Sequence, residues 1–182
     1  MSDTAISAAR PVASPDLFRL AFRRFPSGVA IVTTVGPGGP LGVTITSLRS
    51  LSAEPPLLAF SLLRTASTWP AFTAERRFLV HLPGADQADL AARFSTSGID
   101  RFAAPTRWSR TADGLPCLQG AETVLTCEKA HQVPIGEADL IVGTVLGVVH
   151  RPARSPLVYH DGDFRLLAES PAPRVQPAPA ST

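Results

Sequence analysis

Residues 42–52, with the sequence GVTITSLRSLS, are the most informative part of this chain. The stretch has the β-branched character of a strand, and apolar sequence lies on both sides of it, as in PLLAFSLL at residues 56–63. A buried strand is usually rich in Val and Ile, whereas an exposed one usually carries charges. Here small hydroxyl side chains stand inside an apolar sequence, which requires an explanation: Thr44, Thr46, Ser47, Ser50 and Ser52.

Length and composition exclude several classes of protein. The chain has 182 residues, 45% of them hydrophobic and 18% charged, which favours a single domain with a substantial core. A net charge of +2 is too small to indicate a nucleic-acid surface. No apolar run approaches the roughly 18 residues that span a bilayer, and the first residues do not resemble a secretory signal, so we expect no membrane association. Cys117 and Cys127 have no metal-ligand spacing and are predicted to be free thiols in the cytoplasm.

The hydrophobic patterns predict an antiparallel β fold. Helical spacing is found at residues 16–25 and 85–95, and Ser67 and Thr68 are possible caps of a third, short helix. Turn sequences at PGGP and at Asp161-Gly162 predict hairpins. Because the strands do not alternate with helices as βαβ units, we predict a mainly β fold, a closed antiparallel barrel with peripheral helices. Six or seven strands are expected, at residues 29–35, 41–52, 57–63, 77–84, 117–134, 139–150 and 156–167.

The domain is predicted to span residues 15–168. The flanking segments 1–14 and 169–182 are rich in Ala, Pro and Ser, and we expect both to be poorly ordered. No nucleophile elbow, P-loop or dinucleotide-binding glycine pattern is present, and the four histidines show no metal spacing, so no metal site is predicted. Any reaction is therefore expected to depend on a bound cofactor.

Four segments resemble the flavin reductase-like family, in the same order along the chain. They are FPSGVAIVTT (25–34), the long block 42–68, ARFSTSGIDRF (92–102) and PLVYHDGDF (156–164). The family consists of small FMN- or FAD-binding split-barrel proteins that use NADH or NADPH to supply reduced flavin to two-component monooxygenases. The resemblance extends from about Leu17 to Leu167 and implies an antiparallel split β-barrel.

The resemblance also implies where the flavin binds. Thr44, Ile45, Thr46 and Ser47 match the segment along the isoalloxazine ring, where main-chain amides and small hydroxyls reach the polar ring edge. This would explain the hydroxyl-rich strand; the alternative is a Thr-rich edge strand. The positions that hold the flavin phosphate match Ser61, Arg64, Ser67 and Thr68, and Leu62 beside them is also expected to bind the cofactor. An Arg beside hydroxyls at a helix start suits an anion, although an ordinary cap with a solvated Arg has the same residue types.

Other positions follow from the same resemblance. Phe94, Arg101 and Phe102 match a loop over the flavin, but Phe94 equally suits the core face of a helix, and Arg101 is available for the diphosphate of FAD. Ser27, Tyr159 and His160 are the candidates on the nicotinamide side. His160 has the alternative of being a solvated hairpin residue.

The sequence departs from the family at one triplet. Many members carry Gly-Asp-His where this chain has Gly136-Glu137-Ala138, and that histidine is assigned to nicotinamide binding. Its absence weakens the expectation of NAD(P)H oxidation and leaves flavin binding unaffected.

Three functions remain open from the sequence. The first is an NAD(P)H-dependent flavin reductase that passes reduced flavin by diffusion to a monooxygenase. The second is a flavin-binding protein or partner subunit with little reductase activity. The third is a β-barrel that binds another ligand. A homodimer is expected, because the family builds its flavin site between two barrels and this chain has few charges to cover its strands.

Overall fold

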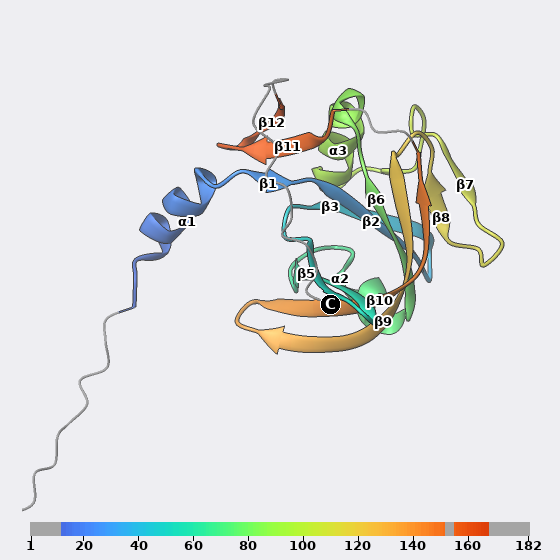
Figure 1. Ribbon diagram of the computed structural model, residues 1–182, viewed down its shortest axis with the longest axis horizontal. Helices are drawn as coiled ribbons and strands as arrows, with labels where there is room; N and C mark the ends of the chain where they lie inside the picture. Colours follow the sequence, from blue (N-terminus) through green and yellow to red (C-terminus); the bar gives the residue numbers. More distant parts are fainter. Residues whose placement is uncertain (1–11, 152–154, 168–182) are drawn as a thin grey trace, which may run out of the picture.

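Most of the chain forms antiparallel β-structure around a curved main sheet (Figure 1). The structure is a computed structural model and describes residues 12–151 and 155–167. The main sheet has seven strands in the order β3-β2-β6-β9-β10-β5-β4. The predicted mainly β, antiparallel fold is confirmed. The strands of this sheet are β2 (Ala30–Gly36), β3 (Gly39–Ile45), β4 (Arg49–Ala53), β5 (Pro56–Leu63), β6 (Arg77–Leu82), β9 (Thr123–Ile135) and β10 (Ala138–His150).

Two smaller sheets complete the β-structure. One has the order β1-β11-β12 and the other pairs β7 with β8. The hairpin predicted at Asp161-Gly162 joins β11 and β12, and both residues have positive φ, 51° and 85°. The single strand expected at 117–134 is instead two strands, separated by Gly120 with φ 85°. These strands are β1 (Ser27–Gly28), β7 (Trp108–Arg110), β8 (Pro116–Leu118), β11 (Leu157–His160) and β12 (Asp163–Leu166).

The three predicted helices are present at the periphery. They are α1 (Pro15–Arg23), α2 (Trp69–Ala74) and α3 (Ala88–Ser95), and a 3-10 turn, η1 (Ala85–Gln87), leads into α3. Figure 1 shows α1 extending away from the sheets, and none of its residues is buried. No helix in the described ranges is long and apolar enough to cross a membrane.

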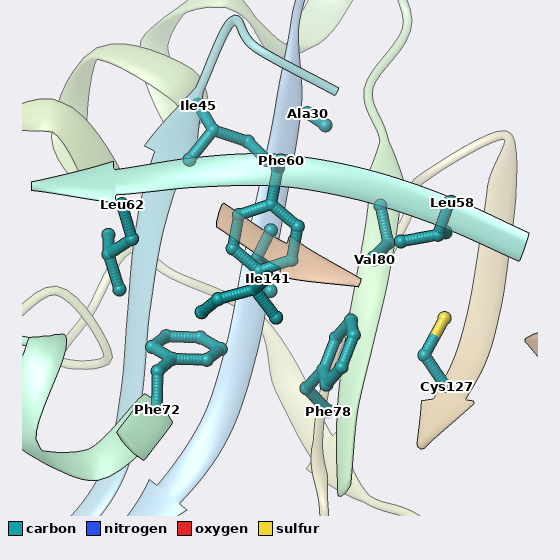
Figure 2. Close-up of a cluster of buried hydrophobic side chains, with 11 residues drawn as sticks. Ala30, Ile45, Leu58, Phe60, Leu62, Phe72, Phe78, Val80, Cys127 and Ile141 are labelled. Atoms are coloured by element: carbon teal, nitrogen blue, oxygen red, sulfur yellow. The ribbon is translucent and has the colours of Figure 1, made fainter. Parts of the chain in front are cut away.

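The main core lies inside the curve of the sheet. Phe60 of β5, Phe72 of α2 and Phe78 of β6 pack edge to face, with ring centroids 5.7–6.4 Å apart (Figure 2). Gly143 on β10 permits this packing, since a Cβ there would lie 2.6 Å from the ring of Phe78. A second core cluster joins Phe94 of α3 with Ile31 of β2 and Leu157 of β11. The two clusters fix the segments that carry the site residues.

The segments predicted to be poorly ordered fall mainly on residues 1–11 and 168–182, outside the described residues.

Candidate functional site

The hydroxyl-rich segment joins the two ends of the main sheet. Ser47, just after β3, is bonded to the backbone of Ser61 on β5: its Oγ accepts the Ser61 N–H at 3.0 Å and donates to the Ser61 carbonyl at 3.2 Å. Thr44 Oγ1 donates to the Ala91 carbonyl of α3 at 2.7 Å. These two hydroxyls therefore hold β3 against β5 and α3. Ile45 is buried in the main core.

Thr46 faces open space between these anchored neighbours. Its side chain makes no hydrogen bond to another described residue, and it lines two hollows that also share Tyr159. The first hollow has a volume of about 310 Å³ and is lined by Phe22, Arg23, Phe25, Ser27, Thr46, Ser47, Arg49 and Tyr159. The second has a volume of about 480 Å³ and is lined by Thr44, Thr46, Ala92, Ser95, Tyr159, Gly162, Asp163 and Phe164.

The strand pair β1–β11 brings nicotinamide-side candidates to the first hollow. Ser27 is directly opposite Tyr159 in this pair, and both line the hollow together with Thr46. The Tyr159 ring packs edge to face on Phe164, with centroids 5.4 Å apart. His160 is half-buried and is not among the residues that line either hollow. Sequence positions more than a hundred residues apart thus share one wall.

The residues predicted to hold a phosphate lie at the end of β5 and in the turn between β5 and α2. Ser61 and Ser67 are exposed, whereas Leu62 is buried in the core. Thr68 is buried, it does not cap α2 with its side chain, and its Oγ1 has no hydrogen-bond partner among the described residues. A buried hydroxyl without a partner is costly, so it is a candidate for a ligand contact. Ser67 lines a third hollow, of about 170 Å³, together with Arg101.

Arg64 connects this turn to the start of β10. Its backbone N–H donates to the Glu137 carbonyl at 3.1 Å, and its Nη2 donates to the Ala138 carbonyl at 3.2 Å. Its Nε donates to Asp139 Oδ1 at 2.8 Å. The hydrogen bond from Arg64, followed by that from Gln132, holds the pKa of the buried Asp139 below its usual value. The sequence placed Arg64 at the phosphate, and the structure adds that it is half of an ion pair.

The loop after α3 is attached to β3. Arg101 Nη1 donates to the Gly42 carbonyl at 2.8 Å and its Nε to the Thr96 carbonyl at 2.9 Å, and burial lowers its pKa. Phe94 is fully buried and packs edge to face on Phe102, with ring centroids 5.1 Å apart. The structure therefore supports the core role for Phe94, one of the two interpretations that its sequence position left open.

Several residues at the site were not anticipated from the sequence. Phe22, Phe25 and Arg49 line the first hollow, and Asp139 anchors Arg64. Only Asp139 carried a usable signal, because a single acidic residue in the apolar run DLIVGTV indicates a buried partner.

The other ionisable residues give no sign of a metal centre. Among residues 12–151 and 155–167, no three His, Cys, Asp or Glu side chains are grouped to hold a metal ion. Cys117 and Cys127 are free thiols, and burial raises the pKa of Cys127 to about 12.

Comparisons with known proteins identify the family of this chain. A family profile described as the flavin reductase like domain matches residues 22–168. The chain belongs to the flavin reductase-like family, as its sequence segments predicted. An NADH:FMN oxidoreductase of Rhodococcus qingshengii is 36% identical over 151 residues, which cover 81% of this chain and 79% of that protein.

Solved structures confirm the split-barrel fold. The crystal structure of a flavin reductase domain protein from Arthrobacter sp. FB24 has a TM-score of 0.81 and 30% identity, covering 87% of this chain and 99% of that one. The styrene monooxygenase flavin reductase (SMOB) from Pseudomonas putida S12 has a TM-score of 0.76 and 28% identity, covering 84% and 98%.

Proposed function

We propose that this protein is an NADH-dependent flavin reductase that reduces FMN and releases it to a partner monooxygenase. The observation that carries the proposal is the arrangement of Thr46 and Tyr159 along two open hollows in a chain of this family, whose turn 64–68 also holds a buried Thr68 hydroxyl with no hydrogen-bond partner among the described residues. Related proteins named as NADH:FMN oxidoreductases favour FMN and NADH over FAD and NADPH. A structural neighbour named as the flavin reductase of styrene monooxygenase favours a monooxygenase as the partner.

The residues present fit a flavin. The hollows around Thr46 combine apolar and aromatic walls with a few polar groups, as a flat ring with one polar edge requires. The turn 64–68 offers a guanidinium, the exposed hydroxyl of Ser67 and the Thr68 hydroxyl, which no described residue partners, for the phosphate. Leu62, Phe94 and Phe102 support these segments from the core.

The chain contributes binding and orientation rather than acid–base chemistry. When bound, the flavin supplies the hydride-accepting ring. Thr46 and the main chain of residues 44–47 would orient the ring edge, while Tyr159 and Ser27 would position the nicotinamide in the first hollow. Arg101 would hold the loop 96–102 against β3 and limit the access of water.

One observation favours a second candidate, a flavin-binding protein with little reductase activity. Ala138 occupies the position of the family histidine, so that imidazole is missing here. The backbone carbonyl of Ala138 accepts a hydrogen bond from Arg64 Nη2. Because Tyr159 lines the first hollow and His160 does not, we assign the compensating nicotinamide contact to Tyr159.

We further propose that the protein is a homodimer in the cytoplasm. The exposed helix α1 carries Phe18 and Phe22, and Phe25 follows shortly after its end; these residues are 57%, 60% and 54% exposed. A nine-residue helix is marginal in water by itself, so a second copy is the occupant that would cover this face. Sedimentation should give a dimer, and Phe18→Ser should shift it toward monomer while the matched control Arg19→Ser should not. A wild-type monomer that still binds FMN would contradict the dimer.

Anaerobic rapid mixing with NADH tests the proposed reaction. If the protein is a reductase, the absorbance of its bound, oxidised FMN should fall rapidly after NADH is added. If it is a flavin-binding protein with little reductase activity, the bound FMN should stay oxidised and yellow. Tyr159→Ala should raise the NADH Michaelis constant, and His160→Ala, on the same hairpin, serves as the matched control. Failure to bind FMN or FAD at all would refute both functions.

A further inference from the structure

The carboxylate of Asp139 is bonded to both ends of the turn that carries the predicted phosphate ligands. Its Oδ1 accepts Arg64 Nε at 2.8 Å, and its Oδ2 accepts Trp69 Nε1 at 2.9 Å. Gln132 Nε2 also donates to Oδ2, at 2.6 Å. Asp139 is 3% exposed, so these bonds are made away from water. Charge-assisted bonds of this kind are short and strongly orienting.

The segment between these two anchors contains the groups available to a ligand. Ser67 is exposed, and the buried Thr68 Oγ1 has no hydrogen-bond partner among the described residues. Within the turn, Trp69 N–H donates to the Ala66 carbonyl at 2.9 Å. A segment of six residues whose first and last side chains share one carboxylate has little freedom to change shape.

We propose that Asp139 is a positioning residue of the flavin phosphate seat, holding Arg64 and Trp69 so that the turn 64–69 is shaped for the phosphate before it binds. This inference rests on the proposed function. It assigns no contact between Asp139 and the flavin, since the carboxylate is buried behind the turn.

The pairing leaves Arg64 able to bind an anion. A guanidinium has five N–H groups, and the bonds to Asp139 and to the Ala138 carbonyl use two of them. The Arg64 side chain is 40% exposed, whereas that of Asp139 is 4% exposed, so the remaining N–H groups lie toward the surface. Asp139 thus selects one orientation of a side chain that would otherwise have many.

A further layer of bonds supports Asp139. Lys129 Nζ donates to Gln132 Oε1 at 3.1 Å, and also to the Phe72 and Thr73 carbonyls in α2 at 2.9 and 2.7 Å. The same network therefore holds α2 at its start, through Trp69, and near its end. This arrangement prevents α2 from moving away when the phosphate is absent.

The test compares FMN with riboflavin, which has the same ring and no phosphate. Asp139→Asn has nearly the same shape, but its amide NH2 group replaces one carboxylate oxygen. Either Arg64, or Trp69 and Gln132 together, then face a donor in place of an acceptor. We expect the dissociation constant for FMN to rise by about tenfold or more, and that for riboflavin to change less than about twofold. Phe78→Leu is the control, since it destabilises the core and should leave the ratio of the two constants unchanged. Circular dichroism checks folding, and Trp69→Phe, which removes only the indole donor, replaces Asp139→Asn if that variant does not fold.

The Arg64→Ala variant separates failure of this inference from failure of the phosphate assignment. It should lower FMN affinity selectively, and adding Asp139→Asn to it should cause no further loss. If Arg64→Ala lowers FMN affinity selectively and folded Asp139→Asn or Trp69→Phe does not, the positioning role is refuted while the phosphate site stands. If Arg64→Ala leaves the ratio of the FMN and riboflavin dissociation constants unchanged, Arg64 does not bind the phosphate. The phosphate assignment of Arg64 and the positioning role of Asp139 then both fail, whereas the reductase function is tested separately by NADH oxidation.

Discussion

Lowering the pH from 7.5 to 5.5 should destabilise this protein through one buried histidine, His81. Its Nδ1–H donates to the Ile31 carbonyl at 3.1 Å, and its Nε2 accepts the Leu118 N–H at 3.0 Å. The ring is 1% exposed and neutral, and it joins β6 to β2 and to β8. A proton on Nε2 would break the bond to Leu118 and leave a charge without water.

The magnitude follows from the pKa. Burial lowers the pKa of His81 from 6.5 to about 4, although the bond to the Ile31 carbonyl acts in the opposite direction. Between these two values the unfolded chain binds more protons than the native protein, so stability is full above pH 6.5 and is lost as the pH falls. The loss is about 1 kcal/mol between pH 7.5 and 5.5, and about 3 kcal/mol once the pH is below 4.

Urea unfolding of flavin-free protein, followed by tryptophan fluorescence at both pH values and one protein concentration, measures this loss. His81→Gln should be less stable than the wild type at pH 7.5 but should lose little further stability at pH 5.5. His131→Gln, at an exposed position, should keep the wild-type pH dependence. If His81→Gln keeps it as well, the protonation of His81 is not its cause.

Three further predictions concern packing, thiols and the nicotinamide site. Gly42→Ala should lower the free energy of unfolding in urea by about 1–3 kcal/mol, because the added Cβ would lie 2.6 Å from the ring of Phe94. Gly38→Ala is the control, since a Cβ there meets nothing within 4 Å. Equal stabilities of the two variants would contradict this prediction. Thiol titration of denatured, unreduced protein should find both cysteines free, and a value near zero would indicate a disulfide. Ala138→His should lower the NADH Michaelis constant, measured by NADH oxidation with saturating FMN; an unchanged constant would place the nicotinamide away from the start of β10.

The sequence alone predicted most of the strands, the three helices and the family. Strand patterns, the glycine turns and the segments 25–34 and 42–68 predicted the antiparallel fold and the flavin reductase-like family, because alternation and turn chemistry are local properties of the chain. It also predicted α1 from helical spacing. It did not predict that α1 would have no buried residue, since burial depends on which surfaces are near, and spacing does not contain that information.

Only the tertiary structure decided which polar groups remain available to a ligand. From the sequence, the hydroxyls of Thr44, Thr46 and Ser47 are equivalent, but the first is bonded to α3 and the third to β5. Of the three, Thr46 lines both hollows and makes no side-chain hydrogen bond to another described residue. In the same way, Arg64 acquires a fixed orientation from Asp139, which is 75 residues away in the chain. Hydrogen-bond partners brought together by the closing of the sheet are set by three-dimensional distance, and a linear pattern of residue types does not record it.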